Sequence, residues 1–449
     1  MKEETKKTQA YSRHLISKEA SEHLDNFNAL LSEMMASAEG KPEALNGVTV
    51  VEVGQANYPG IISSCMLAEF GAEVIKVEPP EGDPARKISQ YGVNVNGDGI
   101  PFLMESRNKN FITLDLKTEK GRANFKKLIG KADVLIDAMR PGFMDELGIG
   151  YRQLHQMHAG LIYLAISPYG HFTKKGKEFR NIPDTDLTAQ AEAGYPALIG
   201  DPEKPEPRNY PLKAGVWAAA YMSAGLAVAG TLTALFFKQR TGEGQMVDVP
   251  TYDAISTWQG FSHVWGFTFE MPRVRVGNFD WCLFPYGYYE TQDGYVSVAA
   301  AADADFRGLL KLLGRWDLEN DWRFLYDRIT DNVEKLKELE AEIKKKLAKI
   351  KSRELVKKAL DYSSKAAKDP IRGKGFPIIV ETLLPRQVLE EDHWKIRNAF
   401  VKVDVEKDGT LQYPSSVPKM SVSPPRVKKI NCGIGVDNEK IYTKYGLDK

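Results

Sequence analysis

The feature that most constrains the fold is a long stretch without a charged side chain, which runs from Ala214 to Phe237 between two lysines. About 20 apolar residues are enough for a helix to cross a bilayer, so length alone allows a membrane span. Composition argues against one, because the stretch is built largely of Ala and Gly and the chain has no second such segment. We expect a buried helix whose small residues let neighbouring backbones approach closely.

Strand-like and helix-like patterns alternate before this stretch. The apolar runs typical of buried strands are 47–54, 72–80, 111–117, 132–139 and 161–170. Helical patterns at 61–70 and 120–129 lie between them. Parallel strands need crossovers of this kind, and helices then cover both faces of their sheet. The N-terminal half therefore predicts an α/β fold with a parallel sheet.

Other segments follow different patterns. Residues 1–44 carry apolar side chains near helical spacing, which predicts an amphipathic helix that covers the protein's own core or docks on a partner. After Phe284, two strand-like runs flank Asp293-Gly294, a dipeptide typical of hairpin turns. A charged helical region at 333–368 follows, and we interpret its lysine runs as a solvated helix face.

Charge and cysteine content argue against several classes. The formal net charge of +1 gives no reason to expect nucleic acid or an anionic membrane as a partner. Cys65, Cys282 and Cys432 form no CxxC pair, so neither disulfides nor a metal site is indicated, and a reducing cytoplasm suits them. The charged N-terminus lacks the apolar region of an ordinary secretory signal. No GxGxxG fingerprint follows the first strand, which argues against a nucleotide redox cofactor.

A series of motifs runs through the chain from Leu45 onward. In order, they are LNGVTVVEV, MLAEFGAEVIKVEPPEGDPAR, SRNKNFITLDLKTEKGRANFKKLIGKADVLIDAMRPG, LGIGY, TGEGQMVDVPTYDA, DHWKIRNAFVKVD and PPRV. Each motif alone is weakly specific. In this order and spacing, the chain resembles the family III CoA-transferases, a CaiB/BaiF-like group that includes formyl-CoA and carnitine CoA-transferases.

The resemblance implies a ring-shaped monomer that interlocks with a second ring. The implied parts are a helical extension at 1–44, a Rossmann-like large domain at 45–250 completed by 425–449, linkers at 251–275 and 401–424, and a smaller α+β domain at 276–400. Because each ring would fill the inner surface of the other, the resemblance also implies an obligate dimer.

Family members use an aspartate that attacks the acyl-CoA thioester to give a mixed anhydride, which CoA thiolate then converts into an aspartyl-CoA thioester. A carboxylate is required because this group must itself become an acyl group. The aspartate belongs to a G-D-x-x-(S/A)-G stretch, and aligning it on Ser223-Ala224-Gly225 puts Tyr221 in its place, after Ala220. A phenol cannot form that anhydride, so we expect no catalytic residue in this chain.

The resemblance also indicates where CoA would bind. Four residues match positions near which relatives hold its adenosine and phosphate portions: Leu114, Lys117, Met139 and Arg140. A structural ion pair explains Arg140 equally well. Where relatives place an arginine toward the phosphates, this chain has Glu146, which would repel a pyrophosphate. The glutamine that commonly follows the first strand in relatives matches Asn57 or Tyr58.

Another acid could replace the missing one. Asp184 and Asp186 are the candidates, but we interpret Asp186 or Thr185 as the cap of the following helix. In a racemase branch of the fold, a histidine near this point pairs with an aspartate near the position of Tyr221. Thr185 stands in that histidine position here, and we assign His171 to the preceding loop.

The expected function follows from the family and from the missing aspartate. We expect a non-catalytic subunit of a heteromeric CoA-transferase, paired with a homologous chain that supplies the aspartate, with acyl-CoA as the substrate of the complex. We expect no metal, nucleic acid or membrane as a partner. The alternatives are an active homodimeric transferase that uses Asp186, an acyl-CoA epimerase or lyase of the same fold, and a non-enzymatic acyl-CoA-binding protein.

Overall fold

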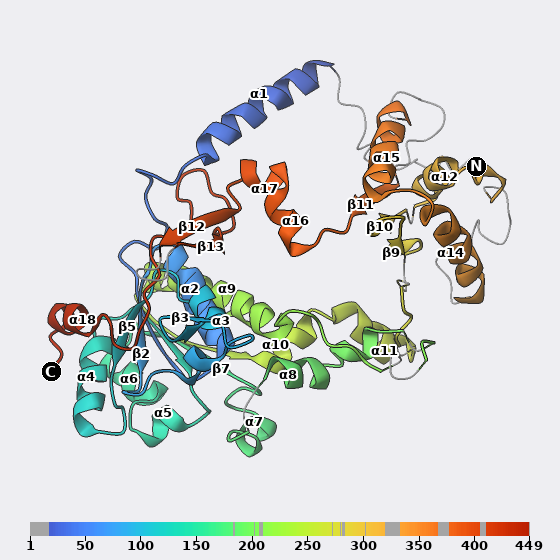
Figure 1. Ribbon diagram of the computed structural model, residues 1–449. Coiled ribbons are helices and arrows are strands. Elements are labelled where there is room, and N and C mark those ends of the chain that lie inside the picture. Colours follow the sequence, from blue (N-terminus) through green and yellow to red (C-terminus); the bar gives the residue numbers. More distant parts are fainter. Residues whose placement is uncertain are drawn as a thin grey trace, which may run out of the picture. The chain divides into compact units, whose positions relative to one another are not determined.

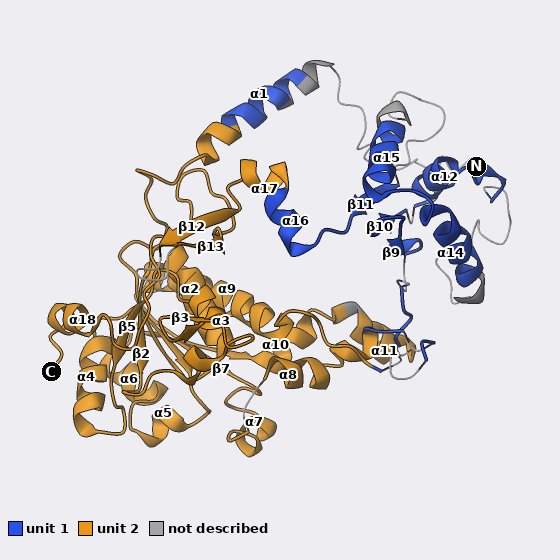
Figure 2. Ribbon diagram, viewed as in Figure 1, with its two compact units in different colours: residues 1–30, 199–210, 274–390 blue, residues 31–198, 211–273, 391–449 orange. Residues whose placement is uncertain are grey.

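The computed structural model describes residues 18–182, 185–201, 203–205, 210–271, 273–278, 280, 283–300, 302–318, 333–366, 377–404 and 410–448 (Figure 1). The chain divides into two compact units (Figure 2). Unit 1 contains residues 1–30, 199–210 and 274–390, and unit 2 contains residues 31–198, 211–273 and 391–449. The chain therefore leaves each unit and returns to it, and α1 (Lys18–Met35) crosses from one unit to the other.

A six-stranded parallel sheet forms the centre of unit 2. Its strands are β1 (Thr49–Gly54), β2 (Glu73–Glu78), β5 (Asn110–Thr113), β6 (Val134–Ala138), β7 (Ile162–Ser167) and β8 (Met246–Pro250). Their spatial order is β5-β2-β1-β6-β7-β8. The chain builds outward from β1 to β5 and then returns to β6 on the other side of β1. Open α/β sheets bind ligands where the strand order reverses in this way.

Helices cover both faces of this sheet, as the alternating sequence pattern predicts (Figure 1). One face packs against α4 (Glu119–Ile129), α6 (Tyr151–Met157) and α18 (Asn438–Tyr445), and the other against α2 (Tyr58–Glu69) and α9 (Ala218–Thr241). Val50 and Val51 are neighbours in β1 and belong to opposite cores, because successive strand side chains point to opposite faces.

The charge-free stretch forms most of α9. By length and composition α9 is able to cross a membrane. In the structure it packs against α2, α8 (Asp186–Glu192), α10 (Thr251–Thr257) and β8. Ala219, Ala224 and Ala227 have no exposed surface, which shows how its small side chains permit close packing. Phe236 and Phe237, in the C-terminal part of the helix, remain exposed.

The C-terminal segment covers the outer edge of β5. The carboxylate of Asp437 accepts a hydrogen bond from the backbone N–H of Phe111 over 2.9 Å, and Asn438 Oδ1 accepts one from that of Thr113 over 2.9 Å. Side chains thus satisfy backbone donors that an exposed edge strand would leave unpaired. The last residues of the chain are therefore part of the unit that contains the sheet.

Unit 1 contains a three-stranded antiparallel sheet in the order β11-β10-β9. The elements are β9 (Tyr286–Glu290), β10 (Tyr295–Ala299), β11 (Ile378–Glu381), α12 (Asp303–Leu312), α14 (Val333–Leu347) and α15 (Ser352–Ala366). The predicted hairpin is confirmed, and Asp293 at its turn accepts a hydrogen bond from the backbone N–H of Ser352. The charged region forms α14 and α15, while 367–368 lie outside the described residues.

Short elements complete the described chain. They are β3 (Asn94–Val95), β4 (Asp98–Gly99), β12 (Phe400–Asp404), β13 (Thr410–Pro414), α3 (Ile100–Met104), α5 (Phe143–Glu146), α7 (Lys174–Glu178), α11 (Gly260–Phe269), α16 (Pro385–Glu390) and α17 (Asp392–Ile396). Among them, β3 pairs with β4 and β12 with β13, both antiparallel.

Candidate functional site

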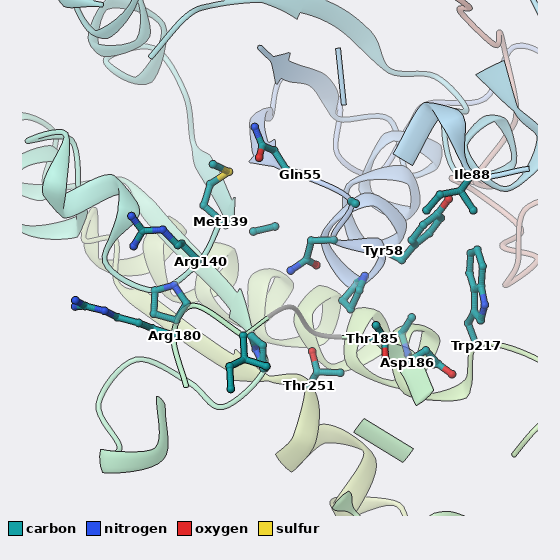
Figure 3. Close-up of a pocket in the computed structure, with 18 residues that line it drawn as sticks. Gln55, Tyr58, Ile88, Met139, Arg140, Arg180, Thr185, Asp186, Trp217 and Thr251 are labelled. Carbon is teal, nitrogen blue, oxygen red and sulfur yellow. Dashed lines mark hydrogen bonds between the residues drawn. The ribbon is translucent and has the colours of Figure 1, made fainter. Parts of the chain in front are cut away.

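A cavity of about 450 Å³ lies at the carboxyl end of the parallel sheet (Figure 3). Residues that follow strands form its wall, namely Gln55 after β1, Met139 after β6, Pro168 after β7 and Thr251 after β8. Because β1 and β6 are the strands at which the order reverses, the topology itself favours ligand binding at this edge.

The two ends of this cavity differ in chemistry. Arg140 and Arg180 lie at one end, and Tyr58, Ile88 and Trp217 lie at the other (Figure 3). The rings of Tyr58 and Trp217 contact each other, with centroids 4.3 Å apart. The cavity therefore suits an elongated ligand that has anionic groups at one end and an apolar group at the other.

The wall after β1 is a tight turn. Ala56 has a left-handed backbone with a φ of 51°, and its N–H donates to Asp83 Oδ1 over 2.8 Å. Asn57 then caps α2 by accepting from the N–H of Gly60 over 3.0 Å. A Cβ atom at Gly60 would meet the Cβ of Ala138 at 2.6 Å, so glycine is needed for α2 to begin this close to β6.

A fully buried set of ion pairs holds this turn. Lys76 Nζ lies 2.6 Å from Glu52 Oε1 and 2.8 Å from Asp83 Oδ2, and Lys109 Nζ lies 3.1 Å from Glu52 Oε2. Burial alone would raise the pKa of Glu52, but Lys109 and Lys76 outweigh it and lower that pKa to about 2. The pairs keep Asp83 in place, and Asp83 in turn fixes Ala56 in the cavity wall.

Asp137 in β6 holds the opposite wall. It accepts hydrogen bonds from the backbone N–H of Met139 over 3.1 Å and from the hydroxyl of Tyr163 over 2.6 Å. Within the described part of the chain, no lysine or arginine is paired with it. Burial raises the pKa of Asp137 to about 6, although the hydrogen bonds from Tyr163 and Met139 oppose the shift.

Two hydroxyl groups in the cavity wall lack partners. Tyr58 is 8% exposed and Thr251 is 1% exposed, and neither Tyr58 Oη nor Thr251 Oγ1 has a hydrogen-bond partner among the described residues. A buried hydroxyl without a partner costs free energy that a polar ligand atom would recover. These two groups are therefore the clearest sign that the cavity is built to hold a ligand.

The first turn of α9 presents Ala220 to the cavity, whereas Tyr221 is not among the lining residues. The side chain of Tyr221 is 42% exposed, and its hydroxyl donates to Glu105 Oε1 over 2.8 Å. Burial of that hydroxyl and the charge of Glu105 raise the pKa of Tyr221 further above its ordinary value. Neither position offers a carboxylate, and Tyr221 stays protonated.

Asp186 lies in the cavity wall beside Ala220. Thr185 caps α8, as predicted. Asp186 serves α9 instead, because its Oδ1 accepts from the backbone N–H of Ala220 over 3.0 Å and its Oδ2 accepts from the side-chain amide of Gln190. Trp217, at the N-cap of α9, makes no capping hydrogen bond. Asp186 thus supplies from another helix the cap that the sequence of α9 lacks.

The residues predicted to hold CoA lie together. Leu114, Lys117 and Met139 line a small cavity of about 50 Å³. Gln55 and Met139 line both this cavity and the larger one, to which Arg140 also belongs. The structure therefore brings the four residues to one region at the carboxyl edge of the sheet, while their binding of CoA stays a prediction.

Arg140 also forms the ion pair that the sequence allowed. Its Nη1 donates to Glu146 Oε1 over 3.0 Å, and the two side chains are 38% and 48% exposed. The hydrogen bond from Arg140 lowers the pKa of Glu146. Because this pair is exposed, the arginine can exchange Glu146 for a ligand phosphate at little cost.

Other predicted residues lie elsewhere. His171 follows β7, and its Nδ1 lies 2.8 Å from Asp248 Oδ1. Burial alone would lower the pKa of His171, but Asp248 outweighs it and the pKa is raised. His171 is not among the cavity-lining residues. Asp184 lies outside the described residues, so its candidate role stays a prediction.

The described ranges contain no group of three His, Cys, Asp or Glu side chains that could hold a metal ion. Cys65 and Cys432 are not joined in a disulfide, and Cys282 lies outside the described residues. The expectation that no metal or redox cofactor takes part stays a prediction. Sequence reasoning missed Asp83, Asp137, Arg180, Trp217 and Thr251, although Asp137 lies in the predicted strand at 132–139 and could have been noticed as a carboxylate in an apolar run.

The chain matches the model of CoA-transferase family III over residues 45–438 and belongs to this family. The succinyl-CoA–D-citramalate CoA-transferase of Chloroflexus aurantiacus is 29% identical over 417 residues, which cover 91% of this chain and 95% of that protein. The alpha and beta subunits of the succinyl-CoA–L-malate CoA-transferase of the same organism are 28% and 26% identical. The match with the alpha subunit covers 87% of this chain and 86% of that subunit. The match with the beta subunit covers 88% of this chain and 93% of that subunit.

The crystal structure of a CAIB/BAIF family protein from Brucella suis has a similar fold. It aligns with a TM-score of 0.75 at 24% sequence identity, over 90% of this chain and 100% of that one. The expected α/β architecture of the family is confirmed.

Proposed function

We propose that this chain is the non-catalytic subunit of a family III CoA-transferase, which binds acyl-CoA while a homologous partner chain supplies the nucleophilic aspartate. The observation that carries the proposal is the first turn of α9. It presents a methyl group, that of Ala220, to the cavity and uses the Tyr221 hydroxyl to bind Glu105. Neither side chain can become an acyl group, as the family's anhydride chemistry requires.

A further observation supports a partner chain. The matched relatives include an enzyme named by its alpha and beta subunits, and both subunits resemble this chain over most of its length. We extend the proposal to an interlocked pair of rings located in the cytoplasm. A mixture of separately purified chains would then form the complex slowly or not at all, whereas co-expression would yield it, which sedimentation analysis can measure.

The cavity also supports a class of substrates. Arg140 and Arg180 suit the phosphates or a carboxylate, and the Tyr58–Trp217 pair suits an apolar or aryl group. The sequence resemblance suggests succinyl-CoA as the donor and (R)-benzylsuccinate as the acceptor, in anaerobic aromatic degradation. A complex that prefers alkyl-only acids over aryl acids would contradict this part of the proposal.

One specific observation favours a second candidate function. Asp186 is a carboxylate in the same cavity wall, so an active homodimer that uses Asp186 as the nucleophile is the alternative. Both of its oxygens already accept hydrogen bonds, from Ala220 and from Gln190. Acylation would convert one oxygen into the bridging oxygen of a mixed anhydride, with release of CoA thiolate, and would weaken the cap of α9, so we favour Asp186 as a structural residue.

Trapping the covalent intermediate separates the two candidates. The co-expressed complex is incubated with succinyl-CoA, treated with hydroxylamine or borohydride, and digested for peptide mass spectrometry. We expect the modified aspartate on the partner chain alone. A modified Asp186 in this chain, or no gain in activity of the complex over the partner alone, would overturn the subunit proposal.

A gain-of-function pair tests which position faces the substrate. Ala220→Asp combined with Asp186→Asn restores a carboxylate to the cavity wall without placing two carboxylates side by side. Tyr221→Asp is the matched control, because its carboxylate would lie toward Glu105. We expect a trapped CoA adduct in the first variant and none in the second.

A further inference from the structure

A second cavity lies at the opposite edge of the parallel sheet, where the strands begin. Its volume is about 740 Å³, and its wall includes Thr49 at the start of β1, Glu73 at the start of β2 and Asn110 at the start of β5. The carboxyl end of β1 borders the cavity of about 450 Å³ proposed to hold acyl-CoA, which we call the acyl-CoA cavity, and the carboxyl ends of β2 and β5 border the small cavity beside it. The second cavity therefore lies at the opposite end of these strands. The proposed transferase function makes no use of this second edge.

Four lysines line this second cavity, which we call the lysine cavity: Lys428, Lys429, Lys440 and Lys444. Two of them are neutralised. Lys428 Nζ lies 2.9 Å from Glu43 Oε1, and Lys444 Nζ lies 2.6 Å from Glu73 Oε2. Glu43 and Glu73 are the acidic residues of the wall. Two positive charges therefore remain, those of Lys429 and Lys440.

These two lysines converge on one neutral atom. Lys429 Nζ donates to Asn110 Oδ1 over 2.9 Å, and Lys440 Nζ donates to the same oxygen over 3.0 Å. No carboxylate of the described residues is ion-paired with either ammonium group. An amide oxygen cannot cancel the repulsion between two like charges that share it. Burial, with the charges of Lys440 and Lys428, lowers the pKa of Lys429 although Asp437 opposes the shift.

The surrounding residues fix this arrangement. Asn110 is 4% exposed and its amide nitrogen donates to the carbonyl of Val74 over 3.2 Å, which turns its oxygen toward the lysines. Asn108 is also buried, and its Oδ1 accepts from the backbone N–H groups of Lys428 and Lys429 over 2.7 and 3.2 Å. Two buried asparagines thus hold the lysines in place, as expected of a preformed binding site.

We propose that the lysine cavity binds a small organic phosphate monoester whose phosphoryl group contacts Lys429 and Lys440. A phosphate monoester carries a charge of about −1.5 to −2 at pH 7, which matches the two unpaired ammonium groups. Lysine binds phosphate as a point charge and does not need the planar geometry of a guanidinium. The cavity is much larger than a bare phosphate ion, so it leaves room for the organic group.

Calorimetric titration of the full-length chain at low salt tests the proposal, with AMP and inorganic phosphate as probes. We expect the variant Lys429→Gln/Lys440→Gln to bind AMP at least about 100-fold more weakly, since it loses two hydrogen bonds between charged groups and each is worth about a tenfold factor or more. Lys429→Arg/Lys440→Arg should keep most of the affinity. The wild type should bind malonate, a dicarboxylate, more weakly than phosphate.

Two control variants locate the site. Lys345→Gln/Lys357→Gln removes two exposed charges from α14 and α15 of unit 1 and should leave AMP binding unchanged. Arg140→Gln/Arg180→Gln removes the two arginines of the acyl-CoA cavity, so the AMP binding that persists in this variant measures the lysine cavity alone. Circular dichroism verifies that each variant is folded. Binding that survives the lysine changes, binding that depends on the arginines instead, or no binding at millimolar phosphate would overturn the proposal.

Discussion

The two walls of the acyl-CoA cavity are held by buried carboxylates in different surroundings. On the β1 side, Glu52 and Asp83 share the charge of Lys76, and the pKa of Glu52 falls to about 2. On the β6 side, Asp137 is held by a phenol and a backbone N–H, and its pKa rises to about 6. Burial is equally deep on both sides, so the charge of the neighbouring groups determines the direction of the shift.

This difference separates two ways of positioning a cavity wall. The β1 wall depends on ion pairs that stay charged over the whole physiological range. The β6 wall depends on a carboxyl that changes its protonation state near pH 6. The stability of the β1 wall should therefore depend on each of its charges, and the stability of the β6 wall should depend on pH.

The largest expected effect comes from Lys76→Met. This change leaves Glu52 and Asp83 buried without their shared cation, and we expect the free energy of unfolding to fall by about 3–5 kcal/mol. Urea denaturation measures this fall in the free energy of unfolding. The control is Lys444→Met, which breaks the partly exposed pair with Glu73 and should cost less than about 1 kcal/mol. Equal costs for the two variants would remove the distinction between buried and exposed pairs.

The second effect concerns pH. Since the folded pKa of Asp137 lies above its ordinary value of 3.8, the folded state holds this proton more tightly, and Asp137 lowers the stability as pH rises from about 4 to about 6. Between about pH 4 and pH 6, the free energy of unfolding of Asp137→Asn should rise by about 2–3 kcal/mol relative to that of the wild type. Above about pH 6 the difference between the two proteins should stay constant. Urea denaturation at several pH values checks this. A difference between the two proteins that is independent of pH would contradict the assignment.

The third effect concerns the hydroxyls without partners. Tyr58→Phe removes a buried group that has no protein partner, so the free energy of unfolding should stay the same or rise by up to about 1 kcal/mol. Acyl-CoA affinity should nevertheless fall about tenfold if the ligand uses this hydroxyl. Tyr163→Phe is the matched control, because it loses a hydrogen bond to Asp137 and should be destabilised. Equal destabilisation of both variants would show that Tyr58 has a structural partner.

The smallest effect is expected at the mouth of the acyl-CoA cavity. Glu146→Gln frees Arg140 from its exposed pair, and CoA affinity should rise about two- to fivefold, the range set by exposed ion pairs. Titration calorimetry measures this change. Glu178→Gln breaks another exposed pair, with Lys174, and serves as the control. A loss of affinity in Glu146→Gln would show that Glu146 itself helps to hold the ligand.

Much of the fold could be predicted because it depends on local patterns. The runs that became β1, β2, β6 and β7 are rich in Val, Ile and Leu, and Asp293-Gly294 marks a hairpin by its turn chemistry alone. The order of the strands, and therefore the edge at which ligands bind, was not evident from periodicity and is set by the tertiary fold.

The site was harder to predict because its parts meet only in space. Asp83 and Ala56 are far apart in sequence, and Asp186 reaches the first turn of α9 from a different helix. A sequence alignment on Ser223-Ala224-Gly225 selects Tyr221, while the direction of the α9 side chains turns Ala220 toward the cavity. One residue in a helix changes the side-chain direction by about 100°, and an alignment of small residues does not fix that register.

The cap that Asp186 provides has an evolutionary consequence. A chain that gained an aspartate at Ala220 first would place two carboxylates side by side, and one of them would have to stay protonated. A chain that lost Asp186 first would leave the start of α9 without its cap. Each order of the two changes therefore passes through a less stable intermediate. A single hydrogen bond between two helices thus limits which side chains position 220 can accept.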